Sequence, residues 1–282
     1  DGWSFKVDPA AVGDVKGAAI YVQARGRLGG VAGDVLWDLI ADQTTPASQM
    51  NPLPAQINST AVKLTWTASD AQNDIDRFEL QYQVNRNGAW SDWKPWLDRP
   101  IPGDARAAWF LGEAGSSYRF RMRAVDRAGN VEAYPDAPET STALAASCTP
   151  DPFEKQGQTI DSALALGRGS LSPVYNLCKA GSGSDVDWLA IDVQAGRDLL
   201  VMLVPGGGGA AFSATLYNPA RKPIGTWKSF DFENGISIRL KNPAAGVYFL
   251  EIRPKPDGLS GTDVRYQVWY GPGYWYYLPL FR

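Results

Sequence analysis

Short stretches in which apolar and polar residues alternate recur along the whole chain. Residues 62–66, 78–84 and 189–193 show this period of two, and turn-forming residues separate such stretches. Glycine and proline are frequent, with 29 and 20 residues, and the Asn-Gly pair at 87–88 is typical of a tight hairpin turn. The pattern predicts an all-β fold, and 282 residues are enough for two domains and a fragment of a third.

Residues 1–42 contain candidate strands but too little chain for a complete domain. The candidates are 3–7, 19–25 and 35–40. The strand and glycine turn at 20–30 are similar to those at 118–130, so the segment resembles the last strands of an immunoglobulin-like domain that lacks its first half. Three strands rarely form a stable unit unless another surface covers their apolar face. We therefore expect residues 1–42 to be a partial Ig-like segment that exchanges strands with a partner.

Residues 43–57 are rich in Pro, Thr, Ser, Asn and Gln and are predicted to be a linker. Residues 58–145 then show the strand spacing of a β-sandwich. This segment resembles the fibronectin type III family, and the residues that carry the resemblance are Trp66, Tyr82 and the strand 118–126. The resemblance implies a binding or spacer module without catalysis. It also implies that Tyr118 is a tyrosine-corner residue, whose hydroxyl group holds the turn before its strand.

Residues 146–270 give a second all-β pattern. This segment resembles the bacterial pre-peptidase C-terminal (PPC) family, whose fold is a jelly-roll-like sandwich. The residues that carry the resemblance are Asp151-Pro152-Phe153-Glu154, Ala163, Asp185-Val186-Asp187-Trp188-Leu189, Gly196, Gly246-Val247-Tyr248 and Tyr266. The expected fold class is thus all-β: tandem β-sandwiches, Ig/fibronectin type III-like and then jelly-roll-like, with partial Ig-like strands at the N-terminus.

Calcium is the candidate cofactor, because some relatives in the PPC family bind it through their acidic opening loop and their Asp-x-Asp loop. The matching positions are Asp151, Glu154, Asp185 and Asp187. Calcium takes six to eight oxygen ligands, and Lys155 would add a positive charge beside the metal. The alternative is that Asp185 and Asp187 shape a turn by accepting backbone hydrogen bonds, with Trp188 anchored in the core.

Cys148 and Cys178 are the only cysteines in the sequence. They could form a disulfide or be two unrelated free thiols. The lack of any other cysteine in a chain with a secreted composition favours the disulfide.

Aromatic residues suggest two further contact surfaces. Trp90, Trp93 and Trp96 could form a platform for a polysaccharide, although in a regular strand Trp93 would point to the face opposite the other two. The alternative is that they pack in the core and cover a sheet edge. The tail 271–282 is dense in aromatics and costly to leave in water. The candidate assembly contacts are Trp3, Phe5, Tyr274, Trp275, Tyr276 and Tyr277.

Charge and residue types exclude several classes of function. The sequence has no histidine, which removes Ser-His-Asp and Cys-His catalysis and His-ligated zinc. Its 27 Lys and Arg residues against 30 Asp and Glu residues form no basic stripe, so we expect no nucleic acid partner. No apolar run is long enough to span a membrane.

These observations predict a non-catalytic, secreted or cell-surface protein. We expect a structural or adhesive module array that self-associates or binds other cell-surface proteins, for example in a filament built by strand complementation. Two alternatives come from other classes: a C-terminal accessory region of a secreted hydrolase such as a protease, and a carbohydrate-binding module.

Overall fold

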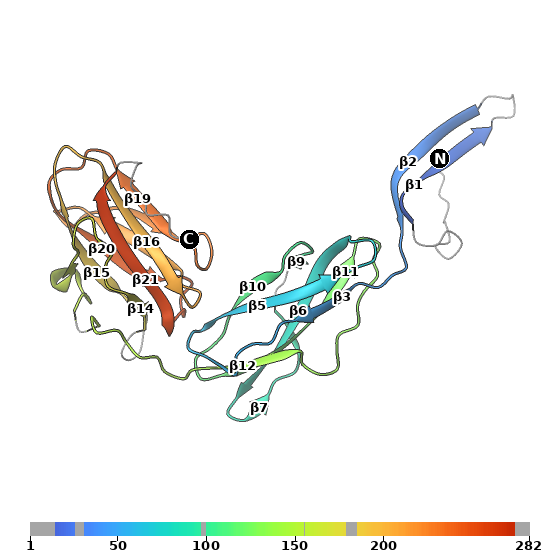
Figure 1. Ribbon diagram of the computed structural model, residues 1–282, viewed down its shortest axis with the longest axis horizontal. Coiled ribbons are helices and arrows are strands. Elements are labelled where there is room, and N and C mark those ends of the chain that lie inside the picture. The colour runs from blue at the N-terminus through green and yellow to red at the C-terminus, as the bar shows by residue number, and fades with distance from the viewer. Residues whose placement is uncertain (1–14, 26–30, 97–99, 155, 179–184, 274–282) are drawn as a thin grey trace. The chain divides into compact units, whose positions relative to one another are not determined.

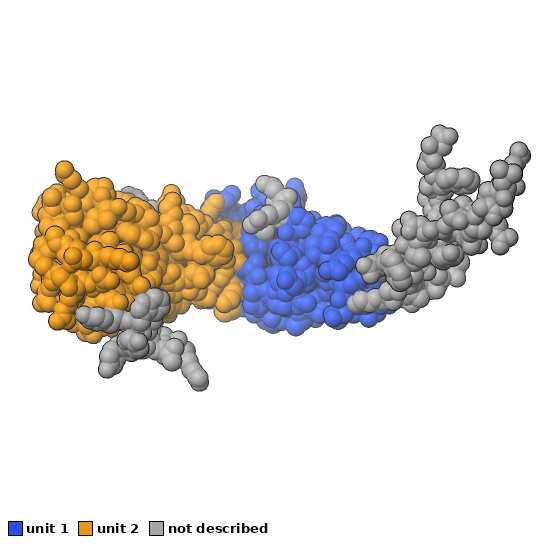
Figure 2. Space-filling view, turned by 90° about the horizontal axis from the view of Figure 1, so that it is seen from above, with its two compact units in different colours: residues 1–53, 64–108, 119–141 blue, residues 54–63, 109–118, 142–282 orange. Residues whose placement is uncertain are grey.

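The computed structural model describes residues 15–25, 31–96, 100–154, 156–178 and 185–273, with side chains described from Asp42 onward (Figure 1). The chain is all-β, and its strands build tandem β-sandwiches, as predicted. It divides into two compact units. Unit 1 comprises residues 1–53, 64–108 and 119–141, and unit 2 comprises residues 54–63, 109–118 and 142–282 (Figure 2).

A two-stranded antiparallel sheet forms from the N-terminal segment. It consists of β1 (Val15–Arg25) and β2 (Val31–Ala41), with Tyr21 opposite Val35 and Arg25 opposite Val31. Two of the three predicted strands are therefore present, and both are longer than predicted. The third candidate, around Trp3 and Phe5, lies outside the described residues.

The first sandwich has two sheets. One sheet has the order β10-β5-β3 and the other the order β4-β12-β11-β6-β7, with β8 and β9 also paired to β6. Their bounds are β3 Ala47–Met50, β4 Gln56–Ile57, β5 Ala61–Ser69, β6 Ile75–Arg86, β7 Ala89–Trp90, β8 Lys94–Pro95, β9 Ile101–Pro102, β10 Ala107–Leu111, β11 Ser117–Asp126 and β12 Thr140–Leu144. Trp66 of β5 and Phe78 of β6 meet edge to face between the sheets, with ring centroids 5.5 Å apart. The predicted alternation thus supplies one buried face to each sheet.

The predicted tyrosine corner is confirmed. The hydroxyl oxygen of Tyr118, at the start of β11, accepts a hydrogen bond of 2.8 Å from the backbone N–H of Glu113. The ring of Tyr118 is 3% exposed and packs edge to face on Phe110 at 5.0 Å. The hydroxyl group therefore satisfies a turn N–H that the strands cannot reach.

The linker prediction for 43–57 needs correction. This segment contains β3, which pairs antiparallel with β5, and β4, which pairs parallel with β12. β3 is a four-residue strand with two polar residues, Ser48 and Gln49, and only Met50 in it is buried. An edge strand needs few apolar residues, because one side of its sheet pairing and much of its surface stay in water.

The second sandwich also has two sheets, with orders β13-β15-β20-β17-β18 and β14-β21-β16-β19. Their bounds are β13 Leu164–Ala165, β14 Tyr175–Leu177, β15 Asp187–Val193, β16 Leu199–Gly207, β17 Phe212–Tyr217, β18 Pro223–Lys228, β19 Ile236–Leu240, β20 Gly246–Pro254 and β21 Gly261–Pro272. A short 3₁₀ turn, η1 (Ile160–Ser162), precedes β13. Phe212 of β17 and Tyr266 of β21 are fully buried and meet between the sheets at 5.5 Å. Nowhere in the described ranges is there a helix with the length and apolar character needed to cross a membrane.

The expectation that Trp188 anchors the core is wrong. Along β15 the buried residues are Asp187, Leu189, Ile191 and Val193, so Trp188 points to the other face of the sheet. There its ring contacts Tyr217, with centroids 5.2 Å apart. The strand register places a carboxylate at the core position that the tryptophan was expected to fill.

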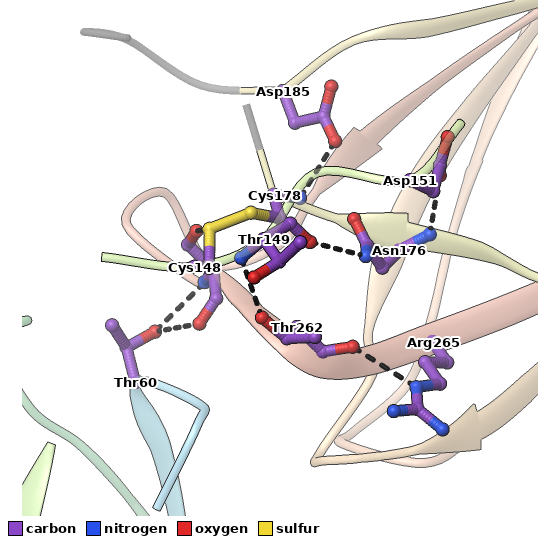
Figure 3. The surroundings of a disulfide bond; sticks show 10 residues. Thr60, Cys148, Thr149, Asp151, Asn176, Cys178, Asp185, Thr262 and Arg265 are labelled. Atoms are coloured by element: carbon purple, nitrogen blue, oxygen red, sulfur yellow. Dashed lines mark hydrogen bonds between the residues drawn. A yellow bond between two sulfur atoms is a disulfide. The ribbon is translucent and has the colours of Figure 1, made fainter. Parts of the chain in front are cut away.

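The predicted disulfide between Cys148 and Cys178 is confirmed, with the two Cα atoms 5.8 Å apart (Figure 3). Cys178 follows β14 and is fully buried. Next to the bridge, Thr149 donates its N–H to the hydroxyl of Thr262 at 2.7 Å, and Asn176 donates its side-chain amide to the Thr149 carbonyl at 3.0 Å. The bridge and these hydrogen bonds fix the start of the second sandwich to β14 and β21.

Candidate functional site

The carboxylates predicted to bind calcium lie around the end of β14 and the start of β15. Asp151 accepts hydrogen bonds from the N–H groups of Phe153 at 2.8 Å and Asn176 at 2.9 Å. Asp185 accepts one from the N–H of Cys178 at 2.9 Å (Figure 3). The Asp185 bond fits the alternative interpretation, in which Asp185 and Asp187 shape a turn by accepting backbone hydrogen bonds. Calcium binding at these positions stays a prediction.

Asp187 is held differently, because it faces the core. Its Oδ2 atom accepts a short hydrogen bond from the hydroxyl group of Tyr266, which is fully buried on β21 in the opposite sheet. A buried carboxylate without a cation is costly unless it takes up a proton. Because Asp187 lies on β15 and Tyr266 lies on β21, their hydrogen bond joins the two sheets through a polar contact within an apolar core.

Burial and mutual repulsion make the carboxyl groups of Asp185 and Asp187 weaker acids than usual. Burial raises the pKa of Asp185 to about 7, and the charges of Glu154 and Asp151 add to the effect. Burial likewise raises the pKa of Asp187 well above its ordinary value, with Asp185 as the next cause. The structure thus brings the predicted carboxylates close enough to repel one another. At neutral pH the group can hold protons.

The predicted aromatic patch consists of Trp90, Trp93 and Trp96, and the structure places two of them against the same arginine. The Arg119 guanidinium lies 4.3 Å from the ring centroid of Trp90 and 5.9 Å from that of Trp93. The alternation expected of a regular strand therefore fails here. The reason is that residues 91–93 leave strand geometry between β7 and β8.

These rings belong to a ladder of cations and aromatics on the outer face of β11. Arg121 lies 4.2 Å from the Trp93 centroid and 5.0 Å from that of Tyr134, and Arg123 lies 4.5 Å from Tyr134. Alternate residues of a strand share a face, which is why residues 119, 121 and 123 can stack in this way. Trp90 is still 38% exposed. Polysaccharide binding by the three tryptophans stays a prediction, since guanidinium groups already cover a face of Trp90 and of Trp93.

Side chains of the neighbouring strand β6 accept hydrogen bonds from the arginines of the ladder. Arg123 donates two hydrogen bonds to Glu79 Oε2, at 2.6 and 2.8 Å, and Arg121 donates one to Gln81 at 2.9 Å. Burial alone would raise the pKa of Glu79, but Arg123 and Arg77 outweigh it and hold that pKa below its ordinary value. Arg121 and Arg123 thus have both hydrogen-bond partners and aromatic neighbours, and the ladder covers the outer face of the sheet.

A second group of carboxylates, which was not predicted from the sequence, lies at one end of the first sandwich. Asp42 follows β2, Asp70 follows β5, Asp74 precedes β6 and Asp126 ends β11. One carboxylate oxygen from each of the four residues lies within 4.8 Å of the other three. Among the described residues, this is the one place where three or more acidic side chains come so close together. Asp42, Asp74 and Asp126 are 6%, 6% and 2% exposed. We call these residues the four-aspartate cluster.

Asp74 is affected electrostatically by the other three members of the four-aspartate cluster. Burial raises the pKa of Asp74, and the carboxylates of Asp70, Asp126 and Asp42 raise it further. Two segments of the sequence carry a signal for the cluster. The loop with Asp70 and Asp74 connects β5 to β6, and the turn Asp126-Arg-Ala-Gly-Asn130 begins at the last residue of β11.

Comparison with known proteins identifies no family. No protein-family model matches the chain, and no curated protein sequence matches it. A solved carbohydrate-binding module of the β-sandwich superfamily is 13% identical over 81% of this chain and 97% of its own, with a TM-score of 0.25. The first three fibronectin domains of chicken CNTN1 are 10% identical over 89% and 74%, with a TM-score of 0.30. The secreted serine protease VesC from Vibrio cholerae is 10% identical over 82% and 51%, with a TM-score of 0.26. These values are too low to carry a functional argument.

Proposed function

We propose that the chain is a non-catalytic structural or adhesive module of an extracellular assembly, in which strand addition to the N-terminal hairpin joins one copy to another. The observation that supports the proposal is the sheet of β1 and β2. Each strand has 11 residues, and within the described ranges each pairs only with the other. The outer edge of each strand therefore offers backbone N–H and C=O groups to a further strand. An isolated two-stranded sheet is at best marginally stable, so pairing would stabilise it.

Other features are compatible with this role. The chain has no histidine. The arginines of the ladder are engaged with aromatic rings and with β6, for example Arg123 with Glu79, so the ladder does not form an open acid–base site. The disulfide fits an oxidising compartment outside the cytoplasm. A module of this kind needs stable sandwiches and one adhesive edge, and no catalytic centre.

Concentration-dependent association tests the proposal. Sedimentation velocity of the full chain should show a mass that rises with concentration, and hydrogen exchange of β1 or β2 amides should slow in parallel. A synthetic peptide with the β1 sequence should compete for the edge and reduce the mass, whereas a scrambled peptide should not. A monodisperse monomer at high concentration, with residues 1–42 open to proteolysis, would contradict assembly through this segment.

A further inference from the structure

We propose that the four-aspartate cluster of Asp42, Asp70, Asp74 and Asp126 binds one calcium ion. Acidic residues often gather at a surface without binding a metal, so the number of carboxylates is not the argument. What distinguishes this cluster is that some of its oxygens already accept hydrogen bonds from the protein, while the remaining ones are buried without a partner among the described residues.

Several carboxylate oxygens of the cluster are buried and accept no hydrogen bond from the described residues. They are Oδ2 of Asp42, Oδ1 of Asp70 and both oxygens of Asp74. Asp42 and Asp74 are each only 6% exposed, so bulk water cannot supply the missing bonds freely. A buried carboxylate with unused lone pairs costs free energy unless a cation or a proton satisfies it.

The other oxygens hold the cluster in position. Asp42 Oδ1 accepts the N–H of Thr44 at 2.7 Å, and Asp70 Oδ2 accepts the N–H of Gln72 at 2.9 Å. Asp126 Oδ1 accepts the N–H groups of Gly129 and Asn130, both at 2.8 Å. In Asp42 and Asp70 one oxygen is thus fixed by the backbone, while the other is buried and accepts no hydrogen bond from the described residues. This division is what a preorganised metal site requires.

The spacing suits calcium. Ca²⁺ binds oxygens at about 2.4 Å, so two ligands on opposite sides of the ion are about 4.8 Å apart. The four ligand oxygens of the cluster lie within 4.8 Å of one another. Ca²⁺ accepts several carboxylates in an irregular shell, whereas Mg²⁺ keeps several water molecules in a strict octahedron. The low exposure of Asp42, Asp74 and Asp126 leaves little room for such water. Zinc prefers nitrogen and sulfur ligands, which the cluster lacks.

The ion would also connect the hairpin to the first sandwich. Asp42 directly follows β2, and its backbone carbonyl accepts a hydrogen bond of 2.9 Å from the Asn130 side chain. That amide also donates to Asp126 Oδ2 at 2.8 Å. Calcium bound to Asp42 and Asp126 would therefore hold the residue that leaves the hairpin against the end of β11. In calcium-free conditions four carboxylates would repel one another at this point.

Calcium titration of the full chain tests the proposal. After treatment with chelator, isothermal titration with CaCl2 should show one strong site per chain, with a Kd on the order of micromolar to millimolar. MgCl2 should bind at least tenfold more weakly. Asp74→Asn should weaken calcium binding at least tenfold, yet in chelator it should melt no lower than the parent chain because it removes one repelling charge.

Control variants separate this site from the rest of the protein. Asp92→Asn changes an exposed aspartate of unit 1, and Asp192→Asn changes an exposed aspartate of unit 2. Both should keep the calcium affinity of the parent chain, whereas Asp185→Asn tests the other candidate calcium position. Circular dichroism in chelator checks folding, and Asp42→Asn replaces Asp74→Asn if the latter is unfolded. The proposal is overturned if the parent chain binds no calcium, if Mg²⁺ binds equally well, or if Asp185→Asn abolishes binding while Asp74→Asn does not.

Discussion

The buried carboxyl group of Asp185 should make the second sandwich less stable as the pH rises from about 4 to about 7. Asp185 is 3% exposed and has one oxygen without a hydrogen-bond partner among the described residues. Its pKa is about 7 in the folded chain, against an ordinary value of 3.8. The folded state therefore holds a proton between these values that the unfolded state releases, so the free energy of unfolding must fall as the pH increases across this window.

The magnitude follows from the pKa values. Each pKa unit corresponds to about 1.4 kcal/mol, so Asp185 alone accounts for a fall of up to about 4 kcal/mol between pH 4 and pH 7. The loss is complete above the folded pKa and absent below the unfolded one. Asp185→Asn keeps an oxygen that can accept the N–H of Cys178 but cannot ionise. Between pH 4 and pH 7 the unfolding free energy of this variant should therefore fall less than that of the parent chain, and the difference should be up to about 4 kcal/mol.

Hydrogen exchange measures this difference within the second sandwich alone. The amides of β15 and β20 are followed in the full chain at about pH 4.5 and about pH 8, in chelator, with correction for intrinsic exchange rates. Asp192→Asn is the matched control, because Asp192 is an exposed residue of the same strand. The explanation is refuted if Asp185→Asn and Asp192→Asn show the same change with pH, to within about 0.5 kcal/mol.

Further predictions concern the stability of each sandwich. Replacing Cys148 and Cys178 by serine opens a loop of 30 residues and should destabilise the second sandwich by about 3.6 kcal/mol in the chain-entropy model, measured by urea denaturation. Tyr118→Phe leaves a turn N–H without its acceptor and should cost about 1–3 kcal/mol in the same assay, whereas a loss below about 0.5 kcal/mol would contradict the tyrosine corner. Arg121→Gln removes the cation beside Trp93 and should lower the melting temperature by an amount equivalent to about 1 kcal/mol, with a parallel change in tryptophan fluorescence.

The fold could be predicted from the sequence wherever a local period decides the structure. Alternation identified strands in both sandwiches, and the role of Tyr118 followed from the resemblance to the fibronectin type III family. The segment 43–57 was misjudged because polar residues are compatible with both a linker and an edge strand such as β3. Trp188 was misjudged because the register of β15 assigns the core position to Asp187, and hydrophobicity alone favoured the tryptophan.

The candidate sites show a different limit of the sequence. Asp185 and Asp187 stand two residues apart and form a visible pattern, yet hydrogen bonds from Cys178 and Tyr266 already use one oxygen of each. The members of the four-aspartate cluster are up to 84 positions apart, between residues 42 and 126, and meet only because the strands beside them end at the same place. Both oxygens of Asp74 accept no hydrogen bond from the described residues. The capacity to bind a cation therefore depends on lone pairs that the fold leaves unused, and the density of carboxylates along the chain does not reveal them.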